Sequence, residues 1–338
     1  MGVRRYYIEL VEGKKKGLFA FLAKIFLFLL SLIYWFLIQL RNFLYSRNLI
    51  LNQISFNIPI ISIGNLTWGG TGKTSLSIVL SKRLSGKKIA LLARGYGSDE
   101  VELLKKSLKE SNTHLFVGKN RAQILDKISS DYDLAIFDDG FQYRKVKRDL
   151  DILLINGKNP FGGNRVLPLG ILREPKSCLR RADIVIIMNS APKSLQDYLK
   201  TINPSLEVFS GYYEVKGLFD FEGEVFPKET LLNKPLACFC AIGYPQGFIE
   251  SLKSIGLRPI LNFIYPDHYN LKEKDFRTIE SECKYKGIKH IIITAKDEFR
   301  FKFSTELSIF ILEVSLKIDR LDYFLNIVED KIASKTKA

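Results

Sequence analysis

Cysteine, methionine, tryptophan and histidine are all scarce in this sequence. Its 338 residues include four cysteines, two methionines, two tryptophans and three histidines. Cys238 and Cys240 stand two residues apart in an apolar run, but the chain has no second ligand pair at the spacings that zinc sites use. We therefore expect buried free thiols, which are typical of proteins in a reducing compartment such as the cytosol.

An excess of acidic residues, internal repeats and low-complexity stretches are also lacking. Lysine and arginine number 51 against 36 Asp and Glu, so the formal net charge is +15. With 46% hydrophobic and 26% charged residues the chain is globular, and its length predicts about two domains. The positive excess favours a polyanionic partner: nucleic acid, an anionic membrane or a phosphorylated ligand. Charge alone does not separate these classes.

Residues 18–40 form one long apolar run, which is long enough to cross a bilayer as a helix. A signal peptide fits poorly, because the run is too long and no small-residue cleavage site closes it. Basic residues flank the run on both sides, and Lys24, Ser31 and Gln39 share one narrow helical stripe. We expect a helix lodged in the inner leaflet on the cytosolic side. A full crossing and a buried core helix are the alternatives.

After this run, short apolar strands alternate with helical patterns, which predicts a doubly wound parallel sheet. Near residue 208 the pattern changes, and residues 208–215 and 218–225 resemble the two strands of an antiparallel hairpin. The α/β alternation then resumes. We therefore expect four segments: an N-terminal membrane-associated helix at 1–43, a first α/β domain at 44–207, a hairpin linker at 208–231 and a smaller C-terminal α/β lobe at 232–330.

The sharpest motif is TWGGTGKT at residues 67–74, between a predicted strand and a predicted helix. This is a P-loop in which Thr67 takes the place of the usual first glycine. Its glycines let backbone N–H groups curl around phosphates, and the helix N-terminus adds partial positive charge. Lys73 would reach the β- and γ-phosphates, and the Thr74 hydroxyl would hold Mg²⁺.

A second motif is the apolar strand LAIF at 134–137, which runs into Asp138, Asp139 and Gly140. An acidic residue at the end of such a strand is the Walker B arrangement, in which a carboxylate contacts Mg²⁺ directly or through water. The sequence leaves open which of the two aspartates does so. Together with the P-loop, the motif predicts phosphoryl transfer or nucleotide hydrolysis.

Four further pairs carry polar side chains on apparent loops or helix starts. Asp99 follows RGYG at 94–97 and is a candidate general base. His268 follows Asp267, and Arg173 precedes Glu174 in LPLGILREP at 167–175. Lys296 and Asp297 are adjacent, which is the wrong spacing for the guanine-reading motif of GTPases.

Taken together, these segments resemble the tetraacyldisaccharide 4'-kinase family, the lipid A 4'-kinases of Gram-negative bacteria. The resemblance runs from about residue 41 to 314. Its motifs are GNLTWGGTGKT at 64–74, RGYG at 94–97, DDGFQ at 138–142, LPLGILREP at 167–175, PDH at 266–268 and KD at 296–297.

The resemblance implies an enzyme that moves the γ-phosphate of ATP, with Mg²⁺, to the 4'-hydroxyl of a disaccharide lipid 1-phosphate. It also implies two α/β lobes joined by a β-hairpin, and binding to the cytosolic face of the inner membrane. Family members pair an aspartate and a histidine near the acceptor hydroxyl. The catalytic positions fall on Asp99, His268, Lys73, Asp138 and Asp139. The nucleotide positions fall on Thr67, Trp68, Gly69, Gly70, Thr71, Gly72, Lys73, Thr74, Arg121, Gln142 and Arg173. The metal positions fall on Thr74, Asp138, Asp139 and Glu174.

The sequence departs from the family pattern in three places. Asp99 follows RGYG without the family's longer insert, Tyr143 replaces a histidine, and Leu169 replaces an alanine. Two rival functions are a membrane-associated P-loop NTPase switch without a lipid acceptor and a nucleic-acid-binding ATPase. The apolar anchor, and the lack of a recognisable nucleic-acid module, argue against the second and against a nucleic-acid partner.

Overall fold

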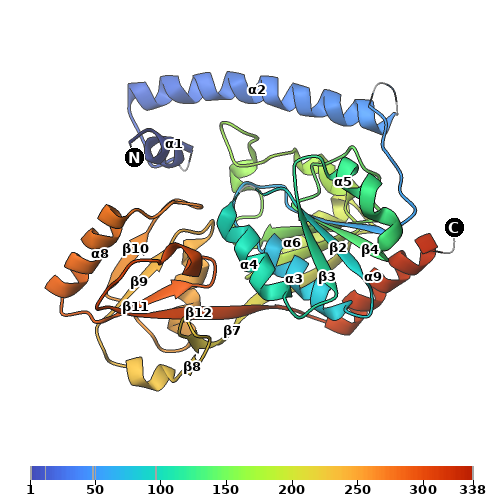
Figure 1. The fold of residues 1–338 in the computed structure, drawn as a ribbon. Helices are drawn as coiled ribbons and strands as arrows, with labels where there is room; N and C mark the ends of the chain where they lie inside the picture. The colour runs from blue at the N-terminus through green and yellow to red at the C-terminus, as the bar shows by residue number, and fades with distance from the viewer. Residues whose placement is uncertain (1, 12, 48, 50, 96, 337–338) are drawn as a thin grey trace.

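A computed structural model of the protein describes residues 2–11, 13–47, 49, 51–95 and 97–336. In these residues one continuous 12-stranded sheet runs through two lobes (Figure 1). The strand order is β10-β9-β11-β12-β7-β6-β5-β1-β4-β2-β3, with β8 beside β7. The strands are β1 Ile60–Gly64, β2 Ile89–Ala93, β3 Thr113–Val117, β4 Leu134–Asp138, β5 Leu150–Asn156, β6 Ile184–Met188, β7 Glu207–Phe219, β8 Val225–Phe226, β9 Leu236–Cys240, β10 Leu261–Ile264, β11 His290–Thr294 and β12 Ser308–Ile318.

The first lobe contains the doubly wound sheet that the sequence predicts. Its strands β1, β2, β4, β5 and β6 are nearly continuous apolar runs, and helices cover both of their faces, as is typical of parallel sheets. The second lobe repeats the arrangement on a smaller scale with β9, β10, β11 and β12 in parallel. The helices of the two lobes are α3 Lys73–Arg83, α4 Ser98–Leu108, α5 Arg121–Ile128, α6 Lys193–Ile202, α7 Pro245–Ser254 and α8 Glu273–Tyr285.

The two lobes are joined by β7 and β12, which pair antiparallel. The predicted pairing of residues 208–215 with 218–225 is wrong, because β7 continues without a turn to Phe219. The chain reverses only at residues 220–224, where the Asp220 side chain accepts the Glu224 backbone N–H and Gly223 has a φ of 88°. Alternating apolar residues predict a strand, but they do not predict which strand it pairs with. In this case the partner lies about a hundred residues further along the chain.

The last helix, α9 (Leu321–Thr336), returns to the first lobe. Phe324, Val328 and Ile332 are buried in the same core cluster as β1, α3 and β6. The predicted second lobe, which ended at residue 330, therefore includes a helix that belongs to the first. β12 leads directly into α9. The β7–β12 connection is therefore fixed at one end in the core of the first lobe and at the other end in the core of the second lobe.

The long N-terminal helix α2 (Leu18–Ser46) lies along one side of the molecule, next to the short helix α1 (Gly2–Val11) (Figure 1). Among the described helices, α2 alone is long and apolar enough to cross a membrane. The Ser31 hydroxyl is buried between the Val166 carbonyl and the Leu169 N–H, and the Tyr34 hydroxyl donates to the Arg173 carbonyl. The face of α2 that carries Ser31 and Tyr34 thus lies against the first lobe. The opposite face exposes large apolar side chains, among them Phe19, Leu22, Phe26, Leu29, Ile33, Phe36 and Leu37.

The packing of α9 gives a first prediction. Phe324 is fully buried and meets the ring of Phe209 edge-on at a centroid distance of 5.4 Å. We expect Phe324→Ala to lower the free energy of unfolding by about 3–5 kcal/mol, through lost apolar contact and a residual cavity. The exposed neighbour Asn326, changed to Ala, should alter it by no more than about 0.5 kcal/mol. Denaturant unfolding of both variants measures this, and equal effects would contradict the packing of α9 in the core.

Candidate functional site

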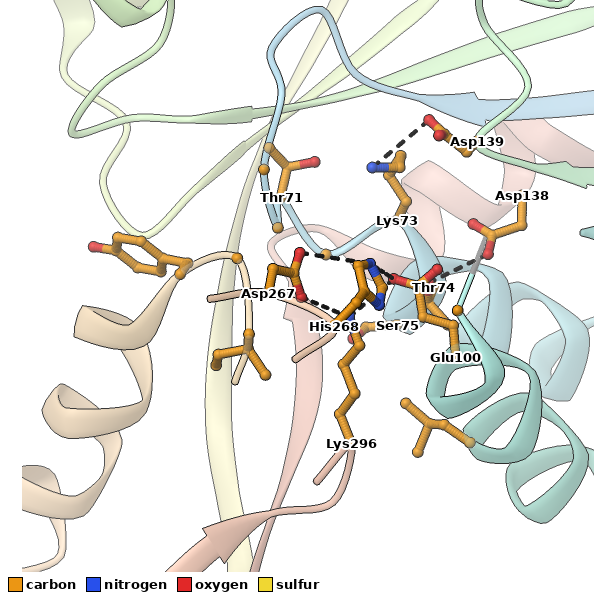
Figure 2. Close-up of a pocket in the computed structure, with 18 of the residues that line it drawn as sticks. Thr71, Lys73, Thr74, Ser75, Glu100, Asp138, Asp139, Asp267, His268 and Lys296 are labelled. Carbon is orange, nitrogen blue, oxygen red and sulfur yellow. Dashed lines mark hydrogen bonds and ion pairs between the residues drawn. The ribbon is translucent and has the colours of Figure 1, made fainter. Parts of the chain in front are cut away.

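A cleft of about 2490 Å³ opens between the two lobes. The carboxyl ends of parallel strands from both lobes reach it, as ligand sites in open α/β sheets do. From the first lobe come the P-loop after β1 and the two aspartates at the end of β4. From the second lobe come the loops that follow β9, β10 and β11. Figure 2 shows side chains of both lobes converging on this space.

The P-loop has the strand–turn–helix context that the sequence predicts. Gly72, at the N-cap of α3, has a φ of 95°, and Gly69 a φ of 123°, conformations that suit glycine. The side chain of Asn65 donates to the Thr71 hydroxyl over 3.0 Å, and so braces the turn from inside. Thr67 is buried, whereas Trp68 is half exposed at the cleft.

The second lobe touches the P-loop directly through Gly243. A Cβ on Gly243 would collide with the backbone nitrogen of Gly70, and a Cβ on Gly70 would lie 3.3 Å from the Gly243 Cα. Two glycines therefore let the backbones of the lobes meet beside the N–H groups that cradle phosphate. Asn65 and Gly243 were not singled out from the sequence, although a glycine after a buried strand is a weak signal of such an approach.

Thr74 and Asp138 lie together at the start of α3. The Thr74 hydroxyl donates to one carboxylate oxygen of Asp138 over 3.2 Å, and the Ser77 hydroxyl donates to the other, also over 3.2 Å. Burial, followed by the nearby Glu100 charge, raises the pKa of Asp138 to about 6. A buried carboxylate short of positive partners and beside a hydroxyl is an arrangement that a hard cation would stabilise.

Asp139 points to the other side of the P-loop. Its carboxylate lies 2.8 Å from the Arg173 guanidinium and 3.6 Å from Lys73 Nζ. Burial alone would raise its pKa, but Lys73 and Arg173 hold the pKa below the usual range. Asp139 also has a left-handed φ of 53°, a conformation that non-glycine residues rarely adopt.

Arg121 and Gln142 support the site from behind. Arg121 is almost fully buried and donates to the backbone carbonyls of Asp138 and Asp139. Gln142 donates to the Asn65 carbonyl over 2.9 Å. Both residues line the cleft, but in this arrangement their hydrogen bonds hold the P-loop and the aspartate turn in place.

Glu174 is the one predicted metal ligand that the structure does not bring to the site. Its carboxylate is fully buried in ion pairs with Arg41 of α2 and Arg181, and it does not line the cleft. With both oxygens taken by guanidinium groups, it has no room for a metal. Its position instead ties α2 to the first lobe.

Asp99 and His268 meet across the cleft. His268 Nδ1 lies 3.0 and 3.2 Å from the two carboxylate oxygens of Asp99. Asp99 sits in the first turn of α4, whereas His268 follows β10 in the second lobe and has a left-handed φ of 59°. The hydrogen bond that His268 Nδ1 donates to the Asp99 carboxylate raises the pKa of His268. The Arg94–Gly97 motif before Asp99 includes Tyr96, which lies outside the described residues.

Charged groups surround this pair. Lys296 Nζ lies 3.4 Å from Asp99, 3.0 Å from Glu100 and 3.1 Å from Asp267. Arg300 donates to Asp99 over 2.6 Å. Burial alone would raise the pKa of Asp99, but the His268 hydrogen bond and the two cations hold it well below its usual range. The sequence marks Lys296 through its KD motif. Arg300 carries no signal, because 201 residues separate it from Asp99.

The chain was then compared with known proteins. A family model described as "Tetraacyldisaccharide-1-P 4'-kinase" matches residues 23–333. A tetraacyldisaccharide 4'-kinase of Halothermothrix orenii is 31% identical over 367 aligned positions, covering 92% of this chain and 94% of the relative. One of Elusimicrobium minutum is 28% identical and covers 88% of each chain.

A solved structure supports the same relationship. The crystal structure of LpxK from Aquifex aeolicus in complex with ATP has a TM-score of 0.68 and 26% sequence identity, and it covers 92% of this chain and 99% of that one. The P-loop and the cross-lobe Asp99–His268 pair both lie within residues 23–333, the part of the chain that the family model matches. This chain belongs to the tetraacyldisaccharide-1-P 4'-kinase family.

Proposed function

We propose that the chain transfers the γ-phosphate of ATP to the 4'-hydroxyl of a tetraacyldisaccharide 1-phosphate lipid, giving lipid IVA. The observation that carries this proposal is a single cleft. It joins a P-loop, a hydroxyl–carboxylate pair suited to Mg²⁺ and an Asp–His pair, and it reaches the apolar helix α2 through Tyr34 and Ile38. The family assignment supports ATP as phosphate donor and a lipid A precursor as acceptor.

The nucleotide phosphates would lie against the P-loop backbone, with Lys73 toward the β- and γ-phosphates. Lys73 and Arg173 are both paired with Asp139 here. These two cations would face the developing negative charge of the transferred group, and Asp139 holds them in place. Catalysis of this kind depends mainly on positioning and charge stabilisation.

The residues present fit a magnesium ion. Mg²⁺ prefers oxygen ligands and commonly takes one or two carboxylates plus substrate phosphates and water. Thr74 and Asp138 provide such oxygens. In the described part of the chain no cluster of three His, Cys, Asp or Glu side chains forms an alternative metal site. We assign Thr74 and Asp138 as its protein ligands, where the bound ion would neutralise phosphate charge.

The Asp99–His268 pair would act as the general base. His268 lines the cleft with its side chain 34% exposed, whereas Asp99 is buried behind it and both carboxylate oxygens are engaged. The proton of the acceptor hydroxyl would pass to His268 Nε2, its oxygen would bond to the γ-phosphorus, and ADP would leave. Asp99 would orient the imidazole and stabilise its positive charge. This reverses the order of roles expected from the sequence, where Asp99 is the base.

The same geometry supports a membrane location on the cytosolic face of the inner membrane. Contacts from Ser31, Tyr34 and Arg41 hold α2 alongside the first lobe, while its opposite face is apolar and exposed. A helix held in this way would enter one leaflet, and the net charge of +15 would favour an anionic membrane surface. We propose no nucleic-acid partner.

Transfer of labelled phosphate tests the function. With γ-labelled ATP, Mg²⁺ and a tetraacyldisaccharide 1-phosphate lipid in mixed micelles, we expect the wild type to label the lipid and Lys73→Ala to lose that activity. Lys105→Ala, an exposed lysine on α4, should behave like the wild type. Lysine-dependent ATP hydrolysis without labelled lipid would contradict the acceptor and favour an NTPase switch.

Two of the three carboxylates predicted as metal ligands, Asp138 and Glu174, should respond differently to substitution. Asp138→Asn should raise the Mg²⁺ concentration for half-maximal transfer by about 10- to 100-fold, because a ligand charge is lost. Glu174→Gln should leave that concentration unchanged and lower the free energy of unfolding by about 1–3 kcal/mol, because it removes the charge of a fully buried carboxylate that pairs with two partly exposed arginines. Magnesium titrations and denaturant unfolding of both variants check this. A shifted Mg²⁺ dependence for Glu174→Gln would contradict this account and indicate that Glu174 is a metal ligand.

A further inference from the structure

A buried chain of polar contacts extends behind the Asp99–His268 pair into the core of the second lobe. It runs from His268 to Asp99, then to Arg300 and finally to Asp297. Arg300 lies in a short helical turn, Glu298–Arg300, that follows β11. Apart from Asp99, every member comes from the second lobe.

Behind His268, which lines the cleft, the other three members of this chain are shielded from solvent. The side chains of Asp99, Arg300 and Asp297 are 6%, 8% and 0% exposed. One terminal nitrogen of Arg300 contacts Asp99, and the other contacts Asp297. A planar guanidinium that bridges two carboxylates fixes both direction and distance, which a lysine ammonium does not.

Asp297 anchors the inner end of the chain. Its carboxylate accepts the Ala241 backbone N–H over 3.2 and 3.3 Å and the Thr294 hydroxyl over 2.6 Å. Ala241 directly follows β9 and Thr294 is the last residue of β11, two central strands of the second lobe, so the orientation of Arg300 is set by the core of that lobe. Lys296 also reaches Asp99, but it is shared with Glu100 and Asp267 and lines the cleft.

We propose that Arg300, anchored by Asp297, is a positioning residue that holds the Asp99 carboxylate in the orientation that aims His268 at the acceptor hydroxyl. His268 Nδ1 lies 3.0 Å from one carboxylate oxygen and 3.2 Å from the other, and this second oxygen also accepts from Arg300 over 2.6 Å, so the arginine fixes the rotation of the carboxylate. Because Asp99 belongs to the first lobe and Arg300 to the second, this hold exists only while the lobes are in contact. The inference rests on the proposed function and adds two residues to it.

A double-mutant cycle tests the role of Arg300. In the wild-type background we expect Arg300→Gln to lower kcat for lipid phosphorylation by about 10- to 100-fold, with the affinity for ATP unchanged. In an Asp99→Asn background the same substitution should lower kcat less than twofold, because the carboxylate it positions is already gone. Lys106→Gln is the matched control. It removes another ion pair between the same two elements, Lys106 to Glu298 at 2.8 Å, and should leave kcat unchanged.

The outcomes distinguish a positioning role of Arg300 from a purely structural one, and they separate the failure of this inference from a failure of the proposed function. An equal loss from Arg300→Gln in both backgrounds, or a loss matched by Lys106→Gln, would mean that Arg300 only stabilises the contact between lobes. If Arg300→Gln did not lower kcat at all, the inference would also be overturned. Labelling of the lipid that depends on Lys73 would still support the proposed function. If Arg300→Gln does not fold, Arg300→Lys replaces it in the same double-mutant cycle. Lysine keeps the buried positive charge but lacks the planar guanidinium that bridges the two carboxylates.

Discussion

The ion pair between Asp99 and the second lobe is the interaction on which the rest of the site depends. The first lobe alone carries the nucleotide machinery: the P-loop, Thr74, Asp138 and the cations paired with Asp139. It does not carry His268, the proposed base. Only when Asp99 meets His268 and Arg300 are the P-loop and the proposed base brought into one cleft.

Several other features place the lobes in this relationship. The antiparallel strands β7 and β12 connect them, and α9 packs the end of that connection into the first core. Gly70 and Gly243 allow the two backbones to touch beside the P-loop. Asp139 and His268, one in each lobe, both have left-handed φ values. Such conformations persist only when surrounding contacts enforce them, and both occur at residues that face the cleft.

Local pattern was sufficient for the parts of the site that lie close together in sequence. Thr74, Lys73 and Asp138 follow buried strands whose carboxyl ends meet at one edge of the sheet, so their convergence could be predicted. The pairing of Asp99 with His268 came from the family resemblance, since no local rule joins residues 169 positions apart. Glu174 was predicted as a metal ligand because its motif places it next to Arg173. The two side chains in fact diverge, with Arg173 turned to the cleft and Glu174 paired with Arg41 and Arg181 away from it.

The features that could not be predicted have one cause in common: each depends on tertiary contacts between residues far apart in the sequence. The sequence of β7 marks a strand, but its pairing with β12 depends on the path of the whole second lobe. The pattern of α9 marks a helix but not which of two cores receives it. Arg300 is one of many basic residues in the sequence, and only its burial between Asp99 and Asp297 distinguishes it.

The most direct test of this account is the titration of His268 by nuclear magnetic resonance, which is practical because the chain has only three histidines. The Asp99 carboxylate favours the positively charged imidazole, so His268 should titrate above the usual value of about 6.5. In Asp99→Asn, which removes that charge, its pKa should fall. A wild-type His268 that titrates at its ordinary value, and is unchanged by Asp99→Asn, would contradict the assembly of the site across the two lobes.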